Sequence, residues 1–334
     1  MAGLIRWGIL SSAGINASVA PAIHAADGCE LAAIASRTAD GAARAAADHG
    51  AARSFSSYDA LLADADIDVV YIPLPNDLHA EWAVRALDAG KHVLVEKPLA
   101  LSVHEVDTVA VAAARNDRLV YEGFMYRHTD RWARLVDVVR SGAIGTPQVV
   151  RVDFAFVVPG DTASGNIRFA AGPGGGIVWD MGCYAVNMAR GVLGAEPSEA
   201  YAVGRARPGV VPETSASGLL SFPDAVASWA VSFDHPSPAA QVEVVGTEGW
   251  VSLTGHVLNR TDPTHLLVYP AGATEPAVET FAPQDPYRLE VEHLSAAVRD
   301  EIDLAWGFDD FRANCAALEA VQMSLRENRP VVIA

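Results

Sequence analysis

Short apolar runs alternate with alanine-rich helical stretches through the N-terminal third of this chain, and no other feature constrains its fold as strongly. The apolar runs span residues 4–10, 31–36, 69–72, 92–96 and 119–122. The helical stretches between them include residues 38–49, 78–89 and 103–116. Strands that alternate with helices form βαβ units around a parallel sheet. The sequence therefore predicts an α/β fold that begins with a Rossmann dinucleotide-binding domain, residues 1–126.

After residues 129–141, which the sequence predicts to be a linking helix, the pattern changes to strands in close succession. The expected strands are residues 148–158, 200–205, 216–222, 226–233, 242–245 and 250–253. The expected helices are residues 177–193, 288–299 and 309–327. Strands joined by short turns are typical of antiparallel sheets. We expect residues 127–334 to form an α/β domain for substrate binding and oligomerisation, with an open, largely antiparallel sheet.

Composition excludes several classes of partner. A formal charge of -17 on 334 residues argues against binding to nucleic acid or to an anionic membrane surface. No apolar stretch is long enough to span a membrane. The three cysteines are odd in number and far apart, which favours neither a disulfide framework nor a metal site. Because a strand begins almost at once, we expect no signal peptide. We expect a cytoplasmic protein that binds no metal.

The apolar run 92–96 ends abruptly in Glu96, Lys97 and Pro98. This places an ammonium group at the carboxyl end of a buried parallel strand, the edge of an open α/β sheet where ligands bind. Burying a lysine is costly unless its charge is paired or used. From this segment alone, a Lys–Glu pair that caps the strand is an equally good interpretation. The loop after the run 69–72 lies at the same edge, and we expect His79 to hold it.

The turn after the first strand is a poor match to the glycine-rich dinucleotide fingerprint. Ser11 and Ala13 stand where the first two glycines belong, and only Gly14 follows. Small residues still permit a close approach of the pyrophosphate, and serine hydroxyls can bind phosphate. Taken alone, the turn is better explained as an ordinary connection from strand to helix.

The end of the second strand favours NADP over NAD. An NAD site usually has an acid here that binds the ribose 2′-hydroxyl, whereas this strand ends in Ser36 and Arg37. A hydroxyl and a guanidinium suit a 2′-phosphate, which arginine grips through its planar fork. The alternative is that Arg37 is a solvated residue at the start of the next helix.

Together these segments resemble the Gfo/Idh/MocA oxidoreductases over nearly the whole chain. The matching segments are residues 36–37, 74–79, 90–98, 122–128, 166–169, 174–184 and 290–294. Within the family, the chain is most similar to the dihydrodiol dehydrogenase and NADP-dependent D-xylose dehydrogenase branch. That branch has a tyrosine where many other members have a catalytic histidine. The glycine-poor turn departs from the family pattern.

The resemblance implies that the first domain binds NADP, with NAD possible, and that a cis Lys97–Pro98 bond lines the nicotinamide pocket. The expected cofactor-binding residues are Ser11, Ser12, Ala13, Gly14, Ile15, Ser36, Arg37, Leu74, Pro75, Asn76, His79, Glu96, Lys97, Pro98 and Arg127. The expected substrate-binding residues are Tyr126, Asn166, Arg168, Trp179 and Asp180.

Hydride transfer from a carbinol carbon requires a base that takes the hydroxyl proton. Asp180 and Tyr184 are spaced i, i+4 and would share one face of the expected helix, and the glycines before it would let its first turn lie close to a ligand. We predict Tyr184 as the acid/base, Lys97 as the group that favours its ionised form or exchanges the proton, and Asp180 as the group that orients Lys97 or binds a substrate hydroxyl. The alternative is that Tyr184 is a packed core aromatic.

Two pairs of expected site residues have equally good structural interpretations. Tyr126 and Arg127 follow the strand at 119–122, where they would meet the ligand or simply pack between domains. Asn166 and Arg168 lie in a polar loop that suits a polyhydroxylated substrate or plain solvation. Family members have an aspartate where this chain has Gly165, so sugar contacts there differ.

Our leading interpretation is an NADP-dependent dehydrogenase or reductase of a sugar, cyclic polyol or dihydrodiol-like compound. One alternative is a redox-neutral glycosidase or epimerase-like enzyme, which oxidises its substrate only transiently. Another is a non-catalytic NADP sensor. Because an antiparallel sheet with helices on one face leaves the other face uncovered, we also expect a homodimer or homotetramer through the C-terminal sheet.

Overall fold

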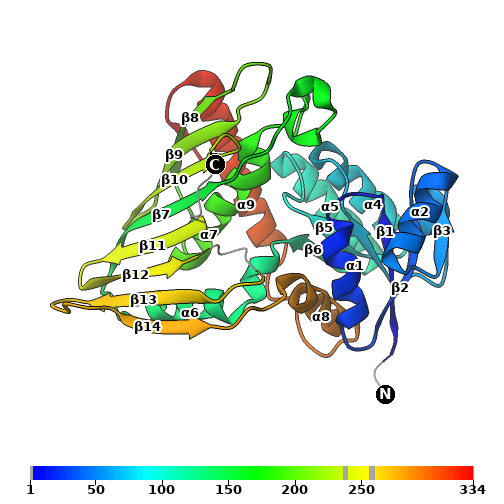
Figure 1. Cartoon of the computed structure of the whole chain (residues 1–334), viewed down its shortest axis with the longest axis horizontal. Helices are drawn as coiled ribbons and strands as arrows, with labels where there is room; N and C mark the ends of the chain where they lie inside the picture. The colour runs from blue at the N-terminus through cyan, green and yellow to red at the C-terminus, as the bar shows by residue number, and fades with distance from the viewer. Residues whose placement is uncertain (1–2, 236–239, 256–259, 334) are drawn as a thin grey trace. The chain divides into compact units, whose positions relative to one another are not determined.

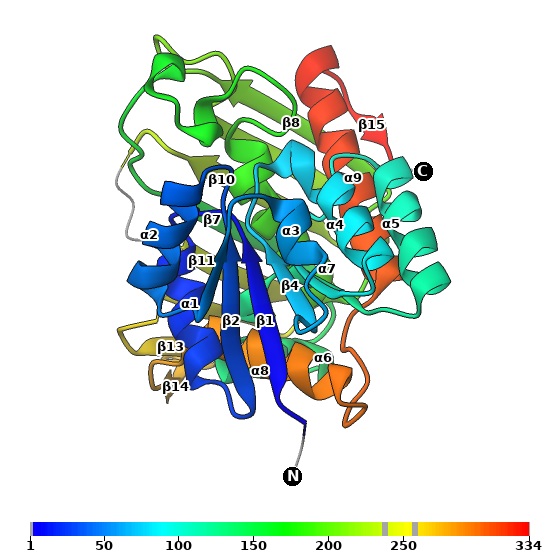
Figure 2. The same cartoon turned by 90° about the vertical axis from the view of Figure 1, so that its right-hand side faces the viewer.

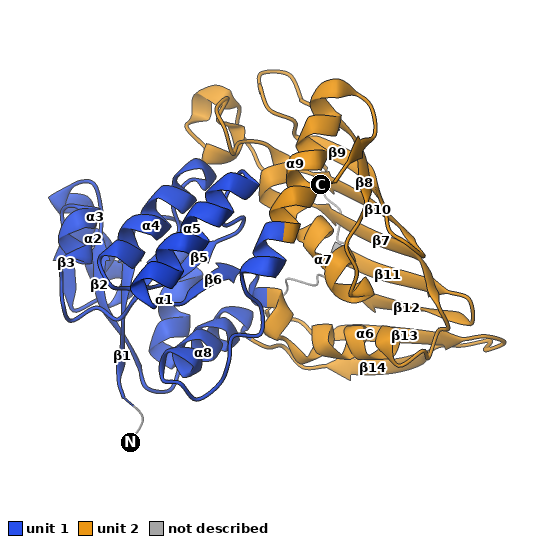
Figure 3. Ribbon diagram, turned by 180° about the vertical axis from the view of Figure 1, so that it is seen from behind, with its two compact units in different colours: residues 1–125, 285–312 blue, residues 126–284, 313–334 orange. Residues whose placement is uncertain are grey.

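The computed structural model describes residues 3–235, 240–255 and 260–333 and divides into two compact units (Figure 3). The first unit contains residues 1–125 and 285–312, and the second contains residues 126–284 and 313–334. The sequence places one domain boundary between residues 126 and 127, but residues 285–312 return to the first unit. The helix Pro286–Val298 of this segment packs in the first unit, where the indole nitrogen of Trp7 donates to Ser295 Oγ at 3.3 Å.

The first unit is built around a six-stranded sheet whose strands follow the order β3-β2-β1-β4-β5-β6. The strands are β1 (Ile5–Leu10), β2 (Cys29–Ala35), β3 (Arg53–Phe55), β4 (Val69–Ile72), β5 (His92–Glu96) and β6 (Val120–Gly123). Every neighbouring pair is parallel. The strand order reverses between β1 and β4, and ligands of doubly wound sheets bind outside the carboxyl ends at this point. The predicted Rossmann domain is confirmed.

Helices cover both faces of this sheet, so its strands are buried and read as continuous apolar runs. The helices are α1 (Asn16–Ala25), α2 (Ala39–His49), α3 (Tyr58–Leu62), α4 (His79–Asp88), α5 (Val103–Asn116) and α8 (Pro286–Val298), with a 3-10 turn, η1 (Asn76–Leu78). α1 packs with α8, and α4 packs with α5 on the other face (Figure 2). Thr38 and Ser102 cap α2 and α5 by accepting backbone N–H bonds.

The second unit contains a nine-stranded sheet in the order β14-β13-β12-β11-β7-β10-β9-β8-β15 (Figure 1). The strands are β7 (Pro147–Ala155), β8 (Glu199–Arg205), β9 (Ser215–Ser221), β10 (Val226–Ser232), β11 (Ala240–Gly246), β12 (Gly249–Thr254), β13 (Thr264–Pro270), β14 (Ala277–Phe281) and β15 (Val331–Val332). Among the residues of this sheet that the structure describes, only β7 and β10 pair in parallel, which confirms the largely antiparallel prediction. The sequence missed β13, β14 and β15 because these strands lie at or near the sheet edges and expose much of their length.

One face of this sheet is covered by α6 (Asp130–Arg140) and α7 (Cys183–Leu193). The long α9 (Phe308–Glu327) contains the division between the two units. Short 3-10 turns complete the second unit at η2 (Met125–His128), η3 (Thr162–Ser164) and η4 (Ile167–Phe169). The sheet residues that face α7, such as Val152 and Phe154, are completely buried.

The predicted helix 177–193 is not one regular α-helix. Its first part, Val178–Gly182, is a π-helical turn that leads into α7. The α-helical spacing that placed Asp180 and Tyr184 on one face therefore does not apply to Asp180. π-Helical turns are uncommon and occur frequently at functional sites.

Within the part of the chain that the structure describes, we find no helix that is both long enough and apolar enough to cross a membrane.

Candidate active site

The turn after β1 uses a serine where a dinucleotide site usually has glycine. Ser11 has a φ of 120°, a conformation that favours glycine. Its side chain donates to Pro73 O at 3.2 Å and accepts from Ala13 N–H at 3.2 Å, while Asn16 Nδ2 donates to Ser11 O at 2.8 Å. These bonds hold a turn that the sequence pattern alone did not establish.

The start of α1 leaves backbone donors for a ligand. Among the described residues, the N–H groups of Gly14 and Ile15 have no hydrogen-bond partner, and no side chain caps the helix. A helix N-terminus with available N–H groups suits a phosphate. The turn therefore fits a pyrophosphate.

The end of β2 presents the two residues predicted to distinguish NADP from NAD. Ser36 is buried, and Arg37 is exposed at the start of the turn into α2. The guanidinium of Arg37 makes no hydrogen bond or ion pair with any described residue. An unpaired arginine beside a serine hydroxyl and a helix N-terminus is a chemically sound partner for a 2′-phosphate.

Lys97 lies at the carboxyl end of β5, and its side chain is buried with only 9% exposed. The Lys97–Pro98 peptide bond is cis, as the resemblance implied. The preceding Glu96 does not simply serve as a pair for Lys97, because its Oε1 accepts from the hydroxyl of the fully buried Tyr71 at 2.6 Å.

His79 connects the loop after β4 to the turn after β5. Its ring nitrogens lie 2.7 Å and 2.8 Å from the carbonyl oxygens of Pro98 and Leu74. Burial lowers the pKa of His79 and the nearby charge of Lys97 adds to this, while the two carbonyl contacts oppose it. With its ring fully buried and both nitrogens engaged, His79 holds the loop, and a direct contact with cofactor stays a prediction.

Two buried acids near this edge were not identified from the sequence. Glu122 Oε1 accepts from Leu99 N–H at 2.8 Å and so holds the chain after the cis peptide. Glu290 on α8 is almost fully buried, and burial first, then the charge of Glu96, raises its pKa well above the usual value. Glu290 comes from a remote segment, so only the matching motif at 290–294 pointed to it.

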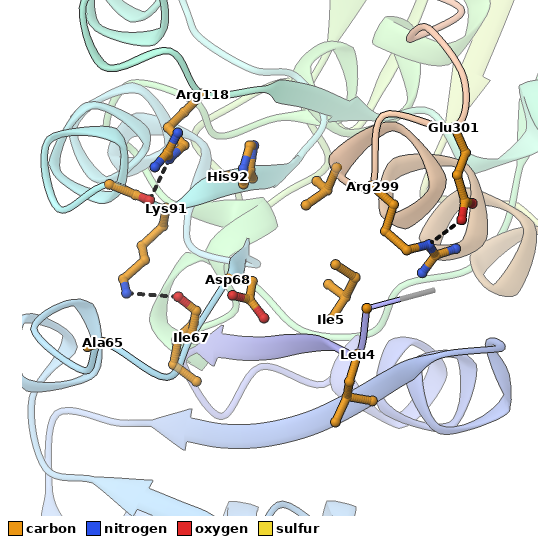
Figure 4. Close-up of a pocket in the computed structure, with 13 residues that line it drawn as sticks. Leu4, Ile5, Ala65, Ile67, Asp68, Lys91, His92, Arg118, Arg299 and Glu301 are labelled. Carbon is orange, nitrogen blue, oxygen red and sulfur yellow. Dashed lines mark hydrogen bonds and ion pairs between the residues drawn. The ribbon is translucent and has the colours of Figure 1, made fainter. Parts of the chain in front are cut away.

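A cavity of about 560 Å³ lies at the opposite, amino edge of the same sheet (Figure 4). Two of its basic side chains are already engaged. Lys91 Nζ donates to the carbonyl oxygens of Asp64 and Ile67 at 2.6 Å and 2.8 Å, and Arg118 Nε donates to Gly90 O at 2.7 Å. Cations that satisfy carbonyl groups stabilise the fold, so we do not place the active site here.

In the second unit, Tyr184 lies in the first turn of α7 and is buried with 5% exposed. Its ring packs at centroid distances of 6.0 Å from Tyr126 and 6.3 Å from Phe154. These contacts agree with the alternative that Tyr184 is a packed core aromatic. An acid/base role for Tyr184 stays a prediction.

Asp180 and Arg168 form an ion pair within the second unit. Arg168 Nε donates to Asp180 Oδ2 at 2.7 Å, and Asn166 Oδ1 accepts from Arg168 N–H at 3.1 Å. The structure thus joins three of the predicted substrate-binding residues. Trp179 lies beside Asp180 in the π-helical turn and is largely buried.

Tyr126 and Arg127 are both held by Asn187 on α7. Asn187 Oδ1 accepts from the Tyr126 hydroxyl at 2.6 Å and from Arg127 Nε at 2.7 Å. Asn187 Nδ2 in turn donates to Asn314 Oδ1 at 3.2 Å. This network fixes Tyr126 and Arg127, and whether either also contacts cofactor or substrate stays a prediction. No sequence signal identified Asn314, because it belongs to the distant α9.

A Rossmann sheet with phosphate-binding features and a buried lysine at its carboxyl edge defines an NAD(P)-binding oxidoreductase. The family model described as "Oxidoreductase family, NAD-binding Rossmann fold" matches residues 5–124, and the GFO/IDH/MocA C-terminal domain model matches residues 132–252. The chain belongs to the Gfo/Idh/MocA oxidoreductase family, and both the resemblance and the enzyme class are confirmed.

Several relatives and solved structures are similar over most of the chain. D-xylose 1-dehydrogenase (NADP(+)) 2 of Haloferax volcanii is 40% identical over 300 residues, which cover 88% of this chain and 89% of the relative. An aldose-aldose oxidoreductase from Caulobacter crescentus has a TM-score of 0.88 and 26% identity, with 98% of this chain and 99% of that chain covered. A 3-ketoreductase from Actinomadura kijaniata in complex with NADP and TDP-benzene has a TM-score of 0.87 and 27% identity, with 96% and 98% covered.

Proposed function

We propose that this enzyme is an NADP-dependent dehydrogenase or reductase of a sugar, a cyclic polyol or a dihydrodiol-like compound. The observation that carries the proposal is the buried Lys97 at the carboxyl edge of the first sheet. The relatives support the substrate class, because they include a D-xylose dehydrogenase and a trans-1,2-dihydrobenzene-1,2-diol dehydrogenase. The unpaired Arg37 and the buried Ser36 support NADP over NAD.

In this proposal the chain's own residues handle the substrate proton. NADP, when bound through the turn 11–15, the pair Ser36–Arg37 and the edge residues 74–76 and 96–98, supplies the hydride acceptor. Tyr184 takes the proton that leaves the substrate hydroxyl as its carbon loses hydride, so that a carbonyl remains. The positive charge of Lys97 stabilises the tyrosinate. Asn166, Arg168 and Asp180 bind the remaining hydroxyl groups.

The test is NADPH formation from NADP, followed by absorbance, across aldoses, inositols, anhydrosugars and trans-dihydrodiols, with a parallel series using NAD. We expect turnover with NADP and a loss of about 10²–10⁴-fold in kcat for Tyr184→Phe, the range typical of a general base. Tyr269→Phe is the matched control, because Tyr269 stacks on Trp250 in the second sheet. Unchanged activity of Tyr184→Phe would remove Tyr184 from the mechanism.

A redox-neutral reaction is the second candidate, favoured by the likeness to an aldose-aldose oxidoreductase. In such a reaction one sugar is oxidised and a second is reduced, so no net NADPH accumulates. Chromatography of two aldoses incubated with enzyme and a trace of NADP distinguishes the two. Formation of a polyol and an oxidised sugar in equal amounts, without NADPH accumulation, would favour this candidate.

We further propose a homodimer or homotetramer through the uncovered face of the second sheet. Val203, Leu219 and Val226 are exposed there, and a groove of about 390 Å³ lies between Tyr201 and Ser228. Leu219→Arg is expected to shift the sedimentation coefficient towards that of a monomer. Val111→Arg, at an exposed position of α5 in the first unit, is the control. A wild-type monomer at micromolar concentration would remove this proposal.

The cytoplasm remains the proposed location. The three cysteines are free thiols, which agrees with a reducing compartment.

A further inference from the structure

Glu213, which precedes β9, lies against the start of the π-helical turn that carries Asp180. Its backbone carbonyl accepts from Ile177 N–H at 2.9 Å, and its Oε1 accepts from Val178 N–H at 3.2 Å. The first N–H groups of a helix have no partner within the helix, so Glu213 satisfies two of them.

The glycine run before this turn allows the carboxyl group to approach. Gly176 has a φ of +98°, and a Cβ atom added there would lie 2.5 Å from Glu213 Oε1. A Cβ atom on Gly175 would lie 2.1 Å from Ala170 O. The sequence predicted that these glycines allow a ligand to approach, whereas the close neighbours in the structure are groups of the protein itself.

Gly176 also connects the turn to the predicted substrate-binding residues. Its N–H donates to Arg168 O at 2.9 Å, and its carbonyl accepts from Asp180 N–H at 3.3 Å. The side chains of Arg168 and Asp180 then form their ion pair at 2.7 Å. A displacement of the turn would therefore move both partners of this pair.

We propose that Glu213 is a positioning residue that, by holding the start of the π-helical turn, fixes Arg168 and Asp180 for substrate binding. This inference rests on the proposed function, which assigns those two residues to the substrate.

In this role the length of the Glu213 side chain matters, and its charge does not. Burial is the main influence on its carboxyl group and raises its pKa, while the hydrogen bonds with Val178 N–H and the Gln322 side chain oppose this rise. An uncharged side chain of the same length offers the same acceptor to Val178 N–H. A shorter side chain keeps the carboxylate but withdraws it from that N–H.

The test compares Glu213→Gln, Glu213→Asp and Glu213→Ala, with Glu199→Ala on the exposed part of β8 as control. We measure kcat and KM for the sugar, the Kd for NADPH by fluorescence, and hydrogen exchange of the peptide covering residues 174–182. For Glu213→Asp and Glu213→Ala we expect KM to rise about tenfold or more, faster exchange, and an unchanged Kd for NADPH. Glu213→Gln and Glu199→Ala are expected to behave as wild type.

Two results would overturn the inference: exchange and KM of Glu213→Asp that match wild type, or Glu213→Gln that is as impaired as Glu213→Asp. If Glu213→Ala fails to fold, the Gln and Asp variants still decide. If the wild-type enzyme turns over no sugar, the proposed function fails. Hydrogen exchange alone then shows whether Glu213 holds the turn. Unchanged exchange in Glu213→Asp would then overturn the role of Glu213.

Discussion

The two ends of strand β5 carry the only two lysines of the sequence, and they have opposite surroundings. Lys91 precedes the strand at the amino edge of the sheet, where its ammonium group donates to two backbone carbonyls. Lys97 follows the strand at the carboxyl edge, beside a cis peptide bond and the phosphate-binding features. Both side chains are buried. From this comparison we propose that the edge of the sheet, and not burial, distinguishes the structural lysine from the functional one.

Apart from ten histidines, the other basic side chains of this chain are arginines, which keep their proton under all ordinary conditions. A lysine can exchange its proton, which is useful only where chemistry takes place. We therefore propose that Lys91, at the amino edge, stabilises the first unit and that Lys97, at the carboxyl edge, takes part in the reaction.

The largest effect is expected from Lys97→Ala. We expect kcat/KM for the sugar to fall by about 10³-fold, because the tyrosinate loses its stabilising charge and the proton loses its carrier. The free energy of unfolding should change little. Initial rates and urea denaturation of the same samples measure both quantities. Loss of stability with unchanged activity would reverse the assignment of the two lysines.

Lys91→Met is expected to have the opposite result. Two hydrogen bonds from a charged group to Asp64 O and Ile67 O are lost, which we expect to lower the free energy of unfolding by about 2–4 kcal/mol. Urea denaturation measures this change. Below the unfolding transition, kcat should stay within about twofold of wild type, and a drop as large as that of Lys97→Ala would contradict the comparison.

Arg37→Ala tests a second group at the carboxyl edge. Loss of a charged hydrogen-bonding partner of the 2′-phosphate should raise KM for NADP by about 10- to 100-fold and leave KM for NAD unchanged. Arg44→Ala is the matched control, because Arg44 is exposed on α2, the helix that follows Arg37. Equal effects on KM for NADP and KM for NAD would mean that Arg37 does not bind the 2′-phosphate.

His92 gives the smallest expected effect and belongs to the amino edge. Burial first, then the charge of Arg118, lowers the pKa of His92 to about 4. The folded state therefore keeps this ring neutral while the unfolded chain binds a proton, so stability is lost as pH falls from about 6.5 towards 4.

His92→Asn tests this pH dependence, because the asparagine oxygen can still accept from Leu119 N–H as His92 Nδ1 does. Between pH 7 and pH 5 the variant should lose less stability than wild type, by about 1 kcal/mol after allowance for partial exposure of the ring. Thermal unfolding at a series of pH values measures this. Parallel curves for the two proteins would show that His92 does not titrate in this range.

The first unit could be predicted well because its functional groups follow directly from local sequence. Each βα connection places its residues at one edge of the sheet, so Ser36, Arg37 and Lys97 were located by counting strands. The cis Lys97–Pro98 bond came from the family motif. Glu290 could not be placed, because it reaches this unit from the distant helix α8.

The second unit was harder to predict because side chains from distant segments hold its functional groups. Asn187 and Asn314 fix Tyr126 and Arg127, and Glu213 holds the turn before Asp180. A helical pattern does not reveal a π-helical turn, since both kinds of helix bury the same apolar residues. Sequence spacing therefore predicts residues for this site but does not predict their arrangement.

The most direct test of the role of Lys97 is a single-turnover measurement of NADPH formation at saturating NADP. We expect Lys97→Ala to bind NADP more weakly, to form NADPH at least 100-fold more slowly even when NADP is saturating, and to recover part of this rate when a small alkylamine is added. Lys91→Met should form NADPH at the wild-type rate and show no response to the amine. A wild-type rate in Lys97→Ala, with the loss confined to NADP affinity, would contradict the account and make Lys97 a binding residue only.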